Sequence, residues 1–487
     1  MKRFLSIPVS LLIFCGPILA QTNGNTGGTD AAQAAVNEAS APEVQAIDFS
    51  NAQNPLLGGI PTGKPTGEVM PLSLSEAIKR GLSYNLGTLL STESVHATRG
   101  ARLIALSQLL PHAGTSLSET QQQVNLAAYG FPGIPGIPMV VGPFNVFDLR
   151  AFVTQTVLDF SMLKRYRAEN ENVKAAQFSN ENTRDLVVYV CANLYLQAVT
   201  SNSRIEATRA QVNTAQVLYN LALDQKSAGV LPGIEVLRAQ VELQAQQQRL
   251  IVAEDQFAKD KLSLARAIGL PLGQEFTITD AMSYSPIPAV SLDEAVQRAY
   301  KERPDYQSAQ ARARSAELNR RAAKAQRYPT IGFSADYGIL GQRPWENHGT
   351  FDVAGIVRFP IFQGGRVQGL VLESDAALRQ CQAEVEDLRG RIYYDIQNAF
   401  LDLKAAADRV QVAQSAIKLA NEQVEQSKDR FRAGVTNNVE VVQAQEALAT
   451  ASENYIASLQ AHSAAKLALA RAMGISDTAY EQFLRGK

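Results

Sequence analysis

The chain has 487 residues, 46% of them hydrophobic, and a formal net charge of −1. This length is enough for three ordinary domains, and the nearly neutral charge gives no reason to expect a nucleic-acid partner. Three cysteines are too few for a disulfide framework.

Residues 1–20 have the pattern of a secretory signal peptide. Lys2 and Arg3 precede an apolar run that ends at Ala20, where cleavage is predicted. Cleavage removes two positive charges and lowers the formal net charge from −1 to −3. Cys15 does not predict a lipid anchor, because Phe14 stands where a lipidation motif needs a small residue. No later run is long and apolar enough to predict a transmembrane helix.

Residues 21–70 are rich in Gly, Thr, Asn, Ala and Pro, a composition that predicts a flexible N-terminal extension. Within it, residues 58–65 read GGIPTGKP, which resembles a phosphate-binding loop. Pro65 replaces the Ser or Thr whose hydroxyl would hold magnesium. Nucleotide binding is therefore not expected.

The chain contains an internal repeat. Residues 226–242 read KSAGVLPGIEVLRAQVE, and residues 431–447, 205 positions later, read FRAGVTNNVEVVQAQEA. Outside these segments, residues 74–78 match 292–296, and 264–269 match 469–474. We predict two structural repeats, 71–270 and 291–475, with a linker at 271–290 and a tail at 476–487.

Each repeat is predicted to run helix, strand, loop, strand, very long helix, turn, helix. The first helices cover 72–110 and 292–327 and end at Pro111 and Pro329. The long helices cover 162–226 and 366–432, and the returning helices cover 233–268 and 435–473. A long helix of this size spans on the order of 100 Å. In the second long helix, small and apolar residues at steps of four and three indicate a coiled-coil seam: Ala413, Ile417, Ala420, Val424, Ser427 and Phe431.

Strand alternation is clear in three segments, 145–157, 330–339 and 351–361, each with one apolar face. A fourth segment, 112–124, is polar and gives a weaker signal. Cys191 and Cys381 fall at different heights of the two long helices, too far apart for a disulfide. Both are interpreted as structural thiols.

Strands of this length can cross an outer membrane at a tilt. Four strands cannot close a barrel, and open edges are not tolerated in lipid, so association of several copies is expected; three copies would supply twelve strands. Aromatic residues near the loop ends, Phe144, Trp345 and Phe351, are predicted to lie at the membrane interface. The alternative is a soluble sheet that packs on a helix bundle.

The duplicated halves, the starts at Leu74 and Leu292, the segment FPIFQGGR at 359–366 and the "AGV" turns at Gly229 and Gly434 resemble TolC-type outer-membrane efflux proteins. The resemblance implies a mainly α fold with a small β portion, in which a homotrimer forms a twelve-stranded β-barrel and a periplasmic tunnel of long antiparallel helices. It further implies a periplasmic adaptor (membrane fusion) protein and an inner-membrane efflux pump or ABC transporter as partners. The expected location is the outer membrane.

Within this resemblance, the repeated turns are predicted to be the periplasmic tip, with Gly229, Val230, Gly434 and Val435 as adaptor contacts. The glycines suit the left-handed conformation that ends a helix, and Asn437 with Glu440 fits a capping box. The resemblance places Glu440 in a ring of acids at the pore entrance; the alternative is a helix cap.

Other tip residues follow from the same resemblance. Glu235 matches an acid in a network that holds neighbouring helices shut, whereas Gln443 stands where a second ring acid is expected. Phe431 and Thr436 replace a tyrosine and an arginine of the family pattern, so the closed state needs other contacts. Arg432 is one hypothesis for such a contact; a solvent-exposed Arg432 is the other.

No enzyme is predicted. The four histidines are scattered without metal-ligand spacing, and no nucleophile motif or dinucleotide fingerprint occurs. We therefore expect no cofactor and no metal, only passive conduction of substrates that a partner pump delivers. The transported substrate cannot be read from the sequence. An outer-membrane component for type I polypeptide secretion and a non-conducting periplasmic coiled-coil scaffold remain as alternatives.

Overall fold

The computed structural model describes residues 54–130, 136, 138–286, 290–433, 435–436 and 438–475. All of them belong to one compact unit that begins at Ala52. The signal peptide, residues 21–53, the tail from 476, Gly434 and Asn437 lie outside the described residues, so the predictions made for them stay predictions. Within the described segments, no helix combines the length and apolar character needed to cross a membrane.

The helices that open the two halves are each broken in two. In the first half, α2 (Leu74–Tyr84) is followed by α3 (Leu86–Ser107), and in the second half α6 (Leu292–Glu302) is followed by α7 (Pro304–Ala325). The single helices predicted for 72–110 and 292–327 are therefore wrong at Asn85 and Arg303, which both have extended backbone. Arg303 precedes Pro304, and the proline ring disfavours helical backbone in the residue before it.

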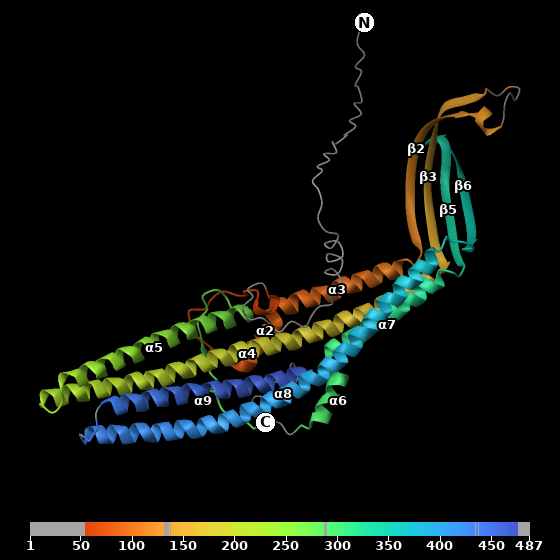
Figure 1. Cartoon of the computed structure of the whole chain (residues 1–487). Coiled ribbons are helices and arrows are strands. Elements are labelled where there is room, and N and C mark those ends of the chain that lie inside the picture. The colour runs from red at the N-terminus through yellow and green to blue at the C-terminus, as the bar shows by residue number, and fades with distance from the viewer. Residues whose placement is uncertain are drawn as a thin grey trace, which may run out of the picture. The chain divides into compact units, whose positions relative to one another are not determined.

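The long helices confirm the prediction from periodicity. Helix α4 covers Phe160–Ser227 and α8 covers Arg366–Arg432; they return through α5 (Gly233–Ala267) and α9 (Asn438–Ala472). Each long helix packs along its returning partner, and α4 also contacts α9, so the two hairpins lie side by side (Figure 1). The predicted seam of α8 faces inward: Ala413, Ala420, Val424, Ser427 and Phe431 are buried.

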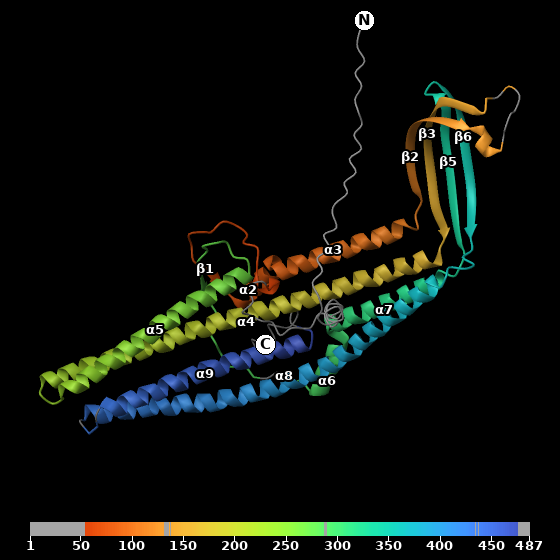
Figure 2. The same cartoon turned by 45° about the horizontal axis from the view of Figure 1, so that its top comes forward.

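The strands form one antiparallel sheet in the order β2-β3-β5-β6, drawn together at one end of α3, α4, α7 and α8 (Figure 2). Their bounds are His112–Asn125, Val140–Leu158, Thr330–Arg343 and Glu346–Arg358. The weakly predicted first strand is present over its whole length. Because β3 of the first half pairs with β5 of the second, the two halves share the sheet.

Residues 54–72, mostly assigned above to a flexible extension, pack on the first half. Pro55–Leu57 forms a 3₁₀ helix, and β1 (Met70–Leu72) pairs in parallel with β4 (Phe276–Ile278) of the predicted linker. The flexible assignment is therefore wrong for residues 54–70. Backbone hydrogen bonds order this segment: the amide of Ile60 donates to the carbonyl of Tyr84 at 2.9 Å, a kind of contact that composition does not reveal.

The same packing explains Gly59 of GGIPTGKP. A Cβ on Gly59 would come within 2.6 Å of the carbonyl oxygen of Arg266 and of the amide nitrogen of Gly269. Gly59 thus allows a close approach of the backbone at Arg266 and Gly269.

The main apolar core of the second half gathers where α6, α8 and α9 meet. Its most buried large side chains are Ile392, Ile396, Leu403, Leu469 and Met473. In the first half, Cys191 is fully buried beside Gly81, and burial raises the pKa of its thiol to about 12. Cys381 is half-buried and both thiols are free, which confirms that they do not form a disulfide.

Candidate functional site

The first tip turn joins α4 to α5. Gly229 has a φ of 75°, its amide donates to Lys226 O at 3.0 Å, and the Val230 amide donates to Gln225 O at 2.9 Å. This pair of bonds is a Schellman motif, which satisfies the last carbonyls of a helix and needs a residue in the left-handed region. Pro232 then precedes α5. The prediction that Gly229 ends the helix is confirmed.

The second tip turn joins α8 to α9. The Val435 amide donates to Arg430 O at 3.0 Å, the bond that corresponds to Val230 and Gln225 in the first turn. Val230 is 69% exposed and Val435 is 70% exposed. Two exposed valines, one on each turn, are available for contact with another protein.

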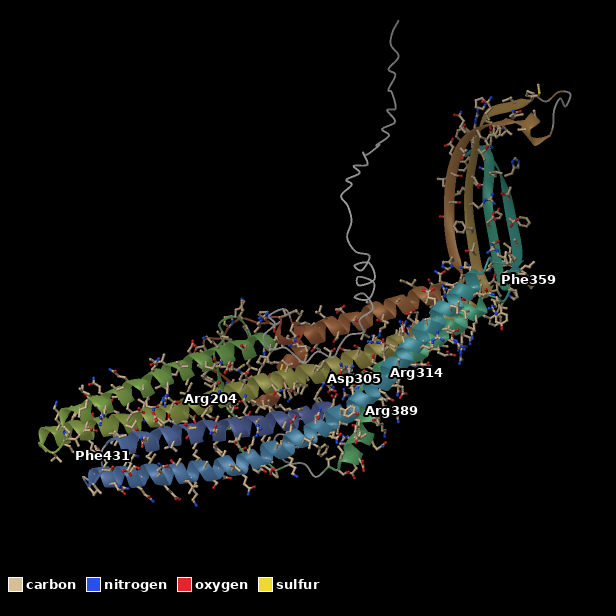
Figure 3. All side chains as sticks on the ribbon, viewed as in Figure 1. Arg204, Asp305, Arg314, Phe359, Arg389 and Phe431 are labelled. Atoms are coloured by element: carbon tan, nitrogen blue, oxygen red, sulfur yellow. The ribbon has the colours of Figure 1, made fainter. Side chains whose placement is uncertain are left out.

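Behind the turns, an apolar contact joins the hairpins. Phe431 is 2% exposed and packs with Leu218 of α4 and Val441 of α9. It lies near the end of α8, close to the tip of the helical hairpins (Figure 3). The phenyl ring is buried where a hydroxyl would need a hydrogen-bond partner, so its replacement of tyrosine suits this packing.

Glu440 is held within the α8–α9 turn. Its carboxylate lies 3.3 Å from the guanidinium of Arg430 and accepts a hydrogen bond from the Thr436 hydroxyl. Gln443, three residues farther along α9, is exposed. Glu440 is therefore oriented by two neighbours and still half-exposed at the tip.

Arg432, one hypothesis for a closed-state contact, pairs with a residue of its own helix. Its guanidinium lies 3.4 Å from Asp429, one turn back on the same exposed helix face. Because the closed state involves neighbouring copies, both hypotheses for Arg432 stay predictions. Arg430 is the arginine that faces Glu440; its only signal in the sequence is its position opposite Glu440 across the turn.

Glu235 lies at the start of α5 and is 8% exposed. One carboxylate oxygen accepts a hydrogen bond from Arg238 at 2.6 Å, and the other is buried with no partner among the described residues. A buried carboxylate oxygen without a donor costs free energy.

The sheet has two chemically different faces. On one face, Ala151 of β3 lies opposite Tyr337 of β5, which lies opposite Phe351 of β6. Two residues along the strands, Val153, Ala335 and Val353 are aligned in the same way. The opposite face carries mainly polar and charged residues. The charged members near its centre are Asp148, Arg150, Asp336 and Asp352.

Arg150 ties the halves together on the polar face. Its guanidinium, on β3, forms an ion pair with Asp336 on β5, lies 3.4 Å from Asp148, and lies 3.5 Å from the hydroxyl of Thr350 on β6. The three strands are thereby joined by side chains as well as by backbone.

The predicted interface aromatics are only partly placed as expected. Trp345 lies in the β5–β6 turn and is 75% exposed. Phe351 is exposed on the apolar face, but it pairs with Tyr337 in the middle of the strands and not at their ends. Phe144 shares the polar face with Asp148 by strand alternation. The interface assignments of Phe351 and Phe144 are therefore wrong, because they rested on distance from loops and not on register.

The family model described as "Outer membrane efflux protein" matches residues 94–270 and 295–475. The chain belongs to this family. Each matched segment lies within one half of the fold. Family membership places the protein in the outer membrane, with its long helical hairpins in the periplasm.

Relatives by sequence agree with this assignment. The probable efflux pump outer membrane protein TtgC of Pseudomonas putida is 22% identical over 416 residues, which cover 82% of this chain and 83% of TtgC. The pyoverdine export outer membrane protein OpmQ of the same species is 25% identical, but the match covers 58% of this chain and only 60% of OpmQ.

Solved structures show the same fold. The CmeC outer membrane channel of Campylobacter jejuni gives a TM-score of 0.74 at 16% identity, covering 87% of this chain and 92% of CmeC. VceC of Vibrio cholerae, an outer membrane protein, gives 0.71 at 18% identity, covering 82% and 96%.

Proposed function

We propose that three copies of the chain form an outer-membrane channel that conducts small molecules from the periplasm to the exterior. The observation that carries this proposal is the four-stranded sheet, in which β3, β5 and β6 share one apolar and one polar face and in which, among the described strands, the outer edges of β2 and β6 are unpaired. Pairing β6 of one copy with β2 of the next removes every edge and gives twelve strands. The apolar face then meets lipid, and the polar face with Arg150 lines the lumen.

Below the barrel, the hairpins of three copies assemble into a periplasmic tunnel. Its tip turns, with the exposed Val230 and Val435, contact a periplasmic adaptor protein, and an inner-membrane pump drives transport. Relatives named for pyoverdine export and for efflux pumps support cargo of small-molecule size. Conduction through the protein itself is passive.

Three copies of Glu440 narrow the entrance of the tunnel. Each carboxylate is already held by Arg430 and Thr436, so it is aimed before the trimer closes. Gln443 lines the same entrance without charge. Glu235, paired with Arg238 at the start of α5, belongs to the contacts that hold neighbouring helices together.

Single-channel recording of the purified full chain in planar bilayers tests this function. We expect discrete openings that prefer cations, because acids near a pore axis attract them. Glu440→Ala should weaken the cation preference, whereas Glu425→Ala, which removes an exposed α8 carboxylate paired with Lys428, should not. Well-folded oligomers that never conduct would favour the non-conducting scaffold. Channels that ignore the Glu440→Ala change would leave Glu440 as a structural residue of the turn.

A further inference from the structure

The two halves leave the sheet in different ways. In the first half, β3 ends at Leu158 and α4 begins at Phe160, so Asp159 alone joins them. In the second half, residues 359–365 separate the end of β6 at Arg358 from the start of α8 at Arg366. We call residues 359–365 the rim loop. It has no counterpart in the first half.

The rim loop exposes large apolar side chains. Phe359 is 67% exposed, Ile361 95% and Phe362 87%. Phe359 lies at the junction between sheet and helices (Figure 3). Tyr328, in the neighbouring turn between α7 and β5, is 58% exposed. Exposed apolar residues grouped in this way mark an interaction surface.

The rim loop continues the apolar face of the sheet. Val353 and Val357 lie on that face of β6, and Phe359 and Ile361 follow at the same two-residue step. The loop then turns sharply through Gly364 and Gly365, both with positive φ, 56° and 85°. The apolar face of the strands and the rim loop therefore share one environment, either lipid or water.

The spacing to the opposite turn fits a bilayer. Trp345 precedes Phe359 by fourteen positions, about 45 Å along an extended strand. At a strand tilt of about 40°, this is roughly 35 Å along the membrane normal. A bilayer has a hydrocarbon core of about 30 Å and measures about 40–45 Å with its headgroups. Trp345 and Phe359 thus fall at opposite interfaces.

Positive charge flanks the loop. Arg327 and Arg366 are exposed, and neither pairs with a carboxylate among the described residues. Arg366 donates a hydrogen bond at 3.1 Å to the side-chain oxygen of Gln326, which holds the two turns together. The loop itself contains no acid, and neither does the first turn of α8. Guanidinium groups in such a setting match the geometry and charge of phosphate.

We propose that the rim loop is a membrane anchor in the leaflet that faces the periplasm. Phe359, Ile361, Phe362 and Tyr328 insert at the boundary between headgroups and acyl chains, while Arg327 and Arg366 bind phosphates of anionic phospholipids. This anchor rests on the proposed function, because it assumes that the strands cross the bilayer. Three rim loops, one for each copy, fix the depth of the barrel from its periplasmic side.

Tryptophan quenching in proteoliposomes tests the anchor, because the chain has a single tryptophan, Trp345. The full-length double variant Trp345→Phe, Phe362→Trp should lose most of its fluorescence when brominated phospholipids are included. Two proteins serve as controls. The native chain should be quenched through Trp345, and Trp345→Phe, Leu272→Trp, at an 80% exposed position far from the sheet in sequence, should not be quenched.

The controls separate the failure of the anchor from the failure of the channel. If the native chain is quenched and the Phe362→Trp variant is not, a neighbouring copy or another protein covers the rim loop, and the proposal is overturned while the barrel stands. If neither is quenched, the strands do not cross the bilayer, and both proposals fall.

A second comparison tests the arginines. Brominated phosphatidylglycerol should quench the Phe362→Trp variant more than brominated phosphatidylethanolamine, and adding Arg327→Gln and Arg366→Gln should abolish the difference. Equal quenching by both lipids before the arginines are changed would show that they do not bind anionic headgroups.

Discussion

In the first half of the molecule, α2 and α3 meet at Asn85; in the second, α6 and α7 meet at Arg303. Both residues contact the end of the returning helix of their own half. The side-chain amide of Asn85 donates to the carbonyl of Ala267 at 3.0 Å, and the Arg303 guanidinium lies 3.4 Å from the carbonyl of Ala472. Ala267 and Ala472 are the last residues of α5 and α9. Each joint therefore ties the opening helices of its half to the returning helix.

The chemistry of the two joints differs. Asn85 is uncharged and also donates at 2.8 Å to the carbonyl of Leu56 in the N-terminal segment. Arg303 is 3% exposed, forms two bonds to Asp305 at 3.0 and 2.7 Å, and reaches Asp395 at 3.1 Å. Burial raises the pKa of Asp305, but the hydrogen bonds and charge of Arg303 outweigh burial and hold this pKa below its usual value.

A pair of glycines is common to both joints. Gly269 and Gly474 have φ values of 63° and 74°. A Cβ on Gly269 would lie 2.6 Å from Ile60 O, and one on Gly474 would lie 2.7 Å from the Cα of Arg303. The repeat thus preserves the close backbone approach at each joint, whereas the side chain that completes the joint is free to be neutral or charged.

The charged joint should be the more sensitive to loss of its central residue. Arg303→Met leaves Asp305 buried without its partner, which we expect to cost about 3–5 kcal/mol. The thermal unfolding midpoint of the detergent-purified protein, followed by circular dichroism, measures the effect. Arg314→Met is the control, since this α7 arginine is 52% exposed in its pair with Glu171 and should contribute at most about 1 kcal/mol. Equal midpoints for the two variants would contradict a stabilising charged joint.

Removing the central residue of the neutral joint should cost less stability. Asn85→Ala removes the hydrogen bonds to Leu56 and Ala267 and the cap on the Gly87 amide, at an expected cost of about 1–3 kcal/mol. It should also speed amide hydrogen exchange in residues 54–60, which Arg303→Met should leave unchanged. Asn421→Ala, at an exposed position of α8, is the matched control. Unchanged exchange in residues 54–60 would show that Asn85 does not hold the N-terminal segment.

Much of this architecture could be predicted because it depends on periodicity. The long helices, the clear strands and the α8 seam follow from the spacing of apolar residues, which burial imposes along tens of residues. The break at Arg303 was missed, although Pro304 disfavours helical backbone in the residue before it and is a signal in the sequence. The break at Asn85 has no such signal, because a buried asparagine in a helical pattern cannot be told from any other polar residue until its partners are known.

The misses at the candidate site have a different cause. Arg430 faces Glu440 only through the geometry of the α8–α9 turn, and a pattern along one helix does not show which residue meets it across a turn. Phe144 was misplaced because the predicted strand began at residue 145, so its face was never assigned. The order in residues 54–70 comes from backbone hydrogen bonds, for which composition carries little signal.

The two halves also differ in the surroundings of a lysine on the returning helix. Lys261 and Lys466 occupy equivalent positions, 205 residues apart. Lys261 is half-buried, with its ammonium 4.8 Å from the centre of the Phe276 ring. Lys466 is 2% exposed and donates to the backbone oxygen of Ser285 at 2.7 Å. Burial lowers the pKa of Lys466 to about 8, from its ordinary value of 10.5.

Because of this buried lysine, the stability of the folded protein changes with pH in the alkaline range. Below pH 8 the folded protein carries the full cost of a buried ammonium, and between pH 8 and 10.5 the unfolded chain binds more protons, so stability rises with pH in that window. We expect a gain on the order of 1 kcal/mol between pH 7 and pH 9.5, less than the shift alone implies because Ser285 still solvates the ammonium. Unfolding midpoints across this range should rise less in Lys466→Met than in the wild type. Lys261→Met, which leaves Lys466 in place, should keep the full rise; if both variants lose it equally, the buried ammonium is not its source.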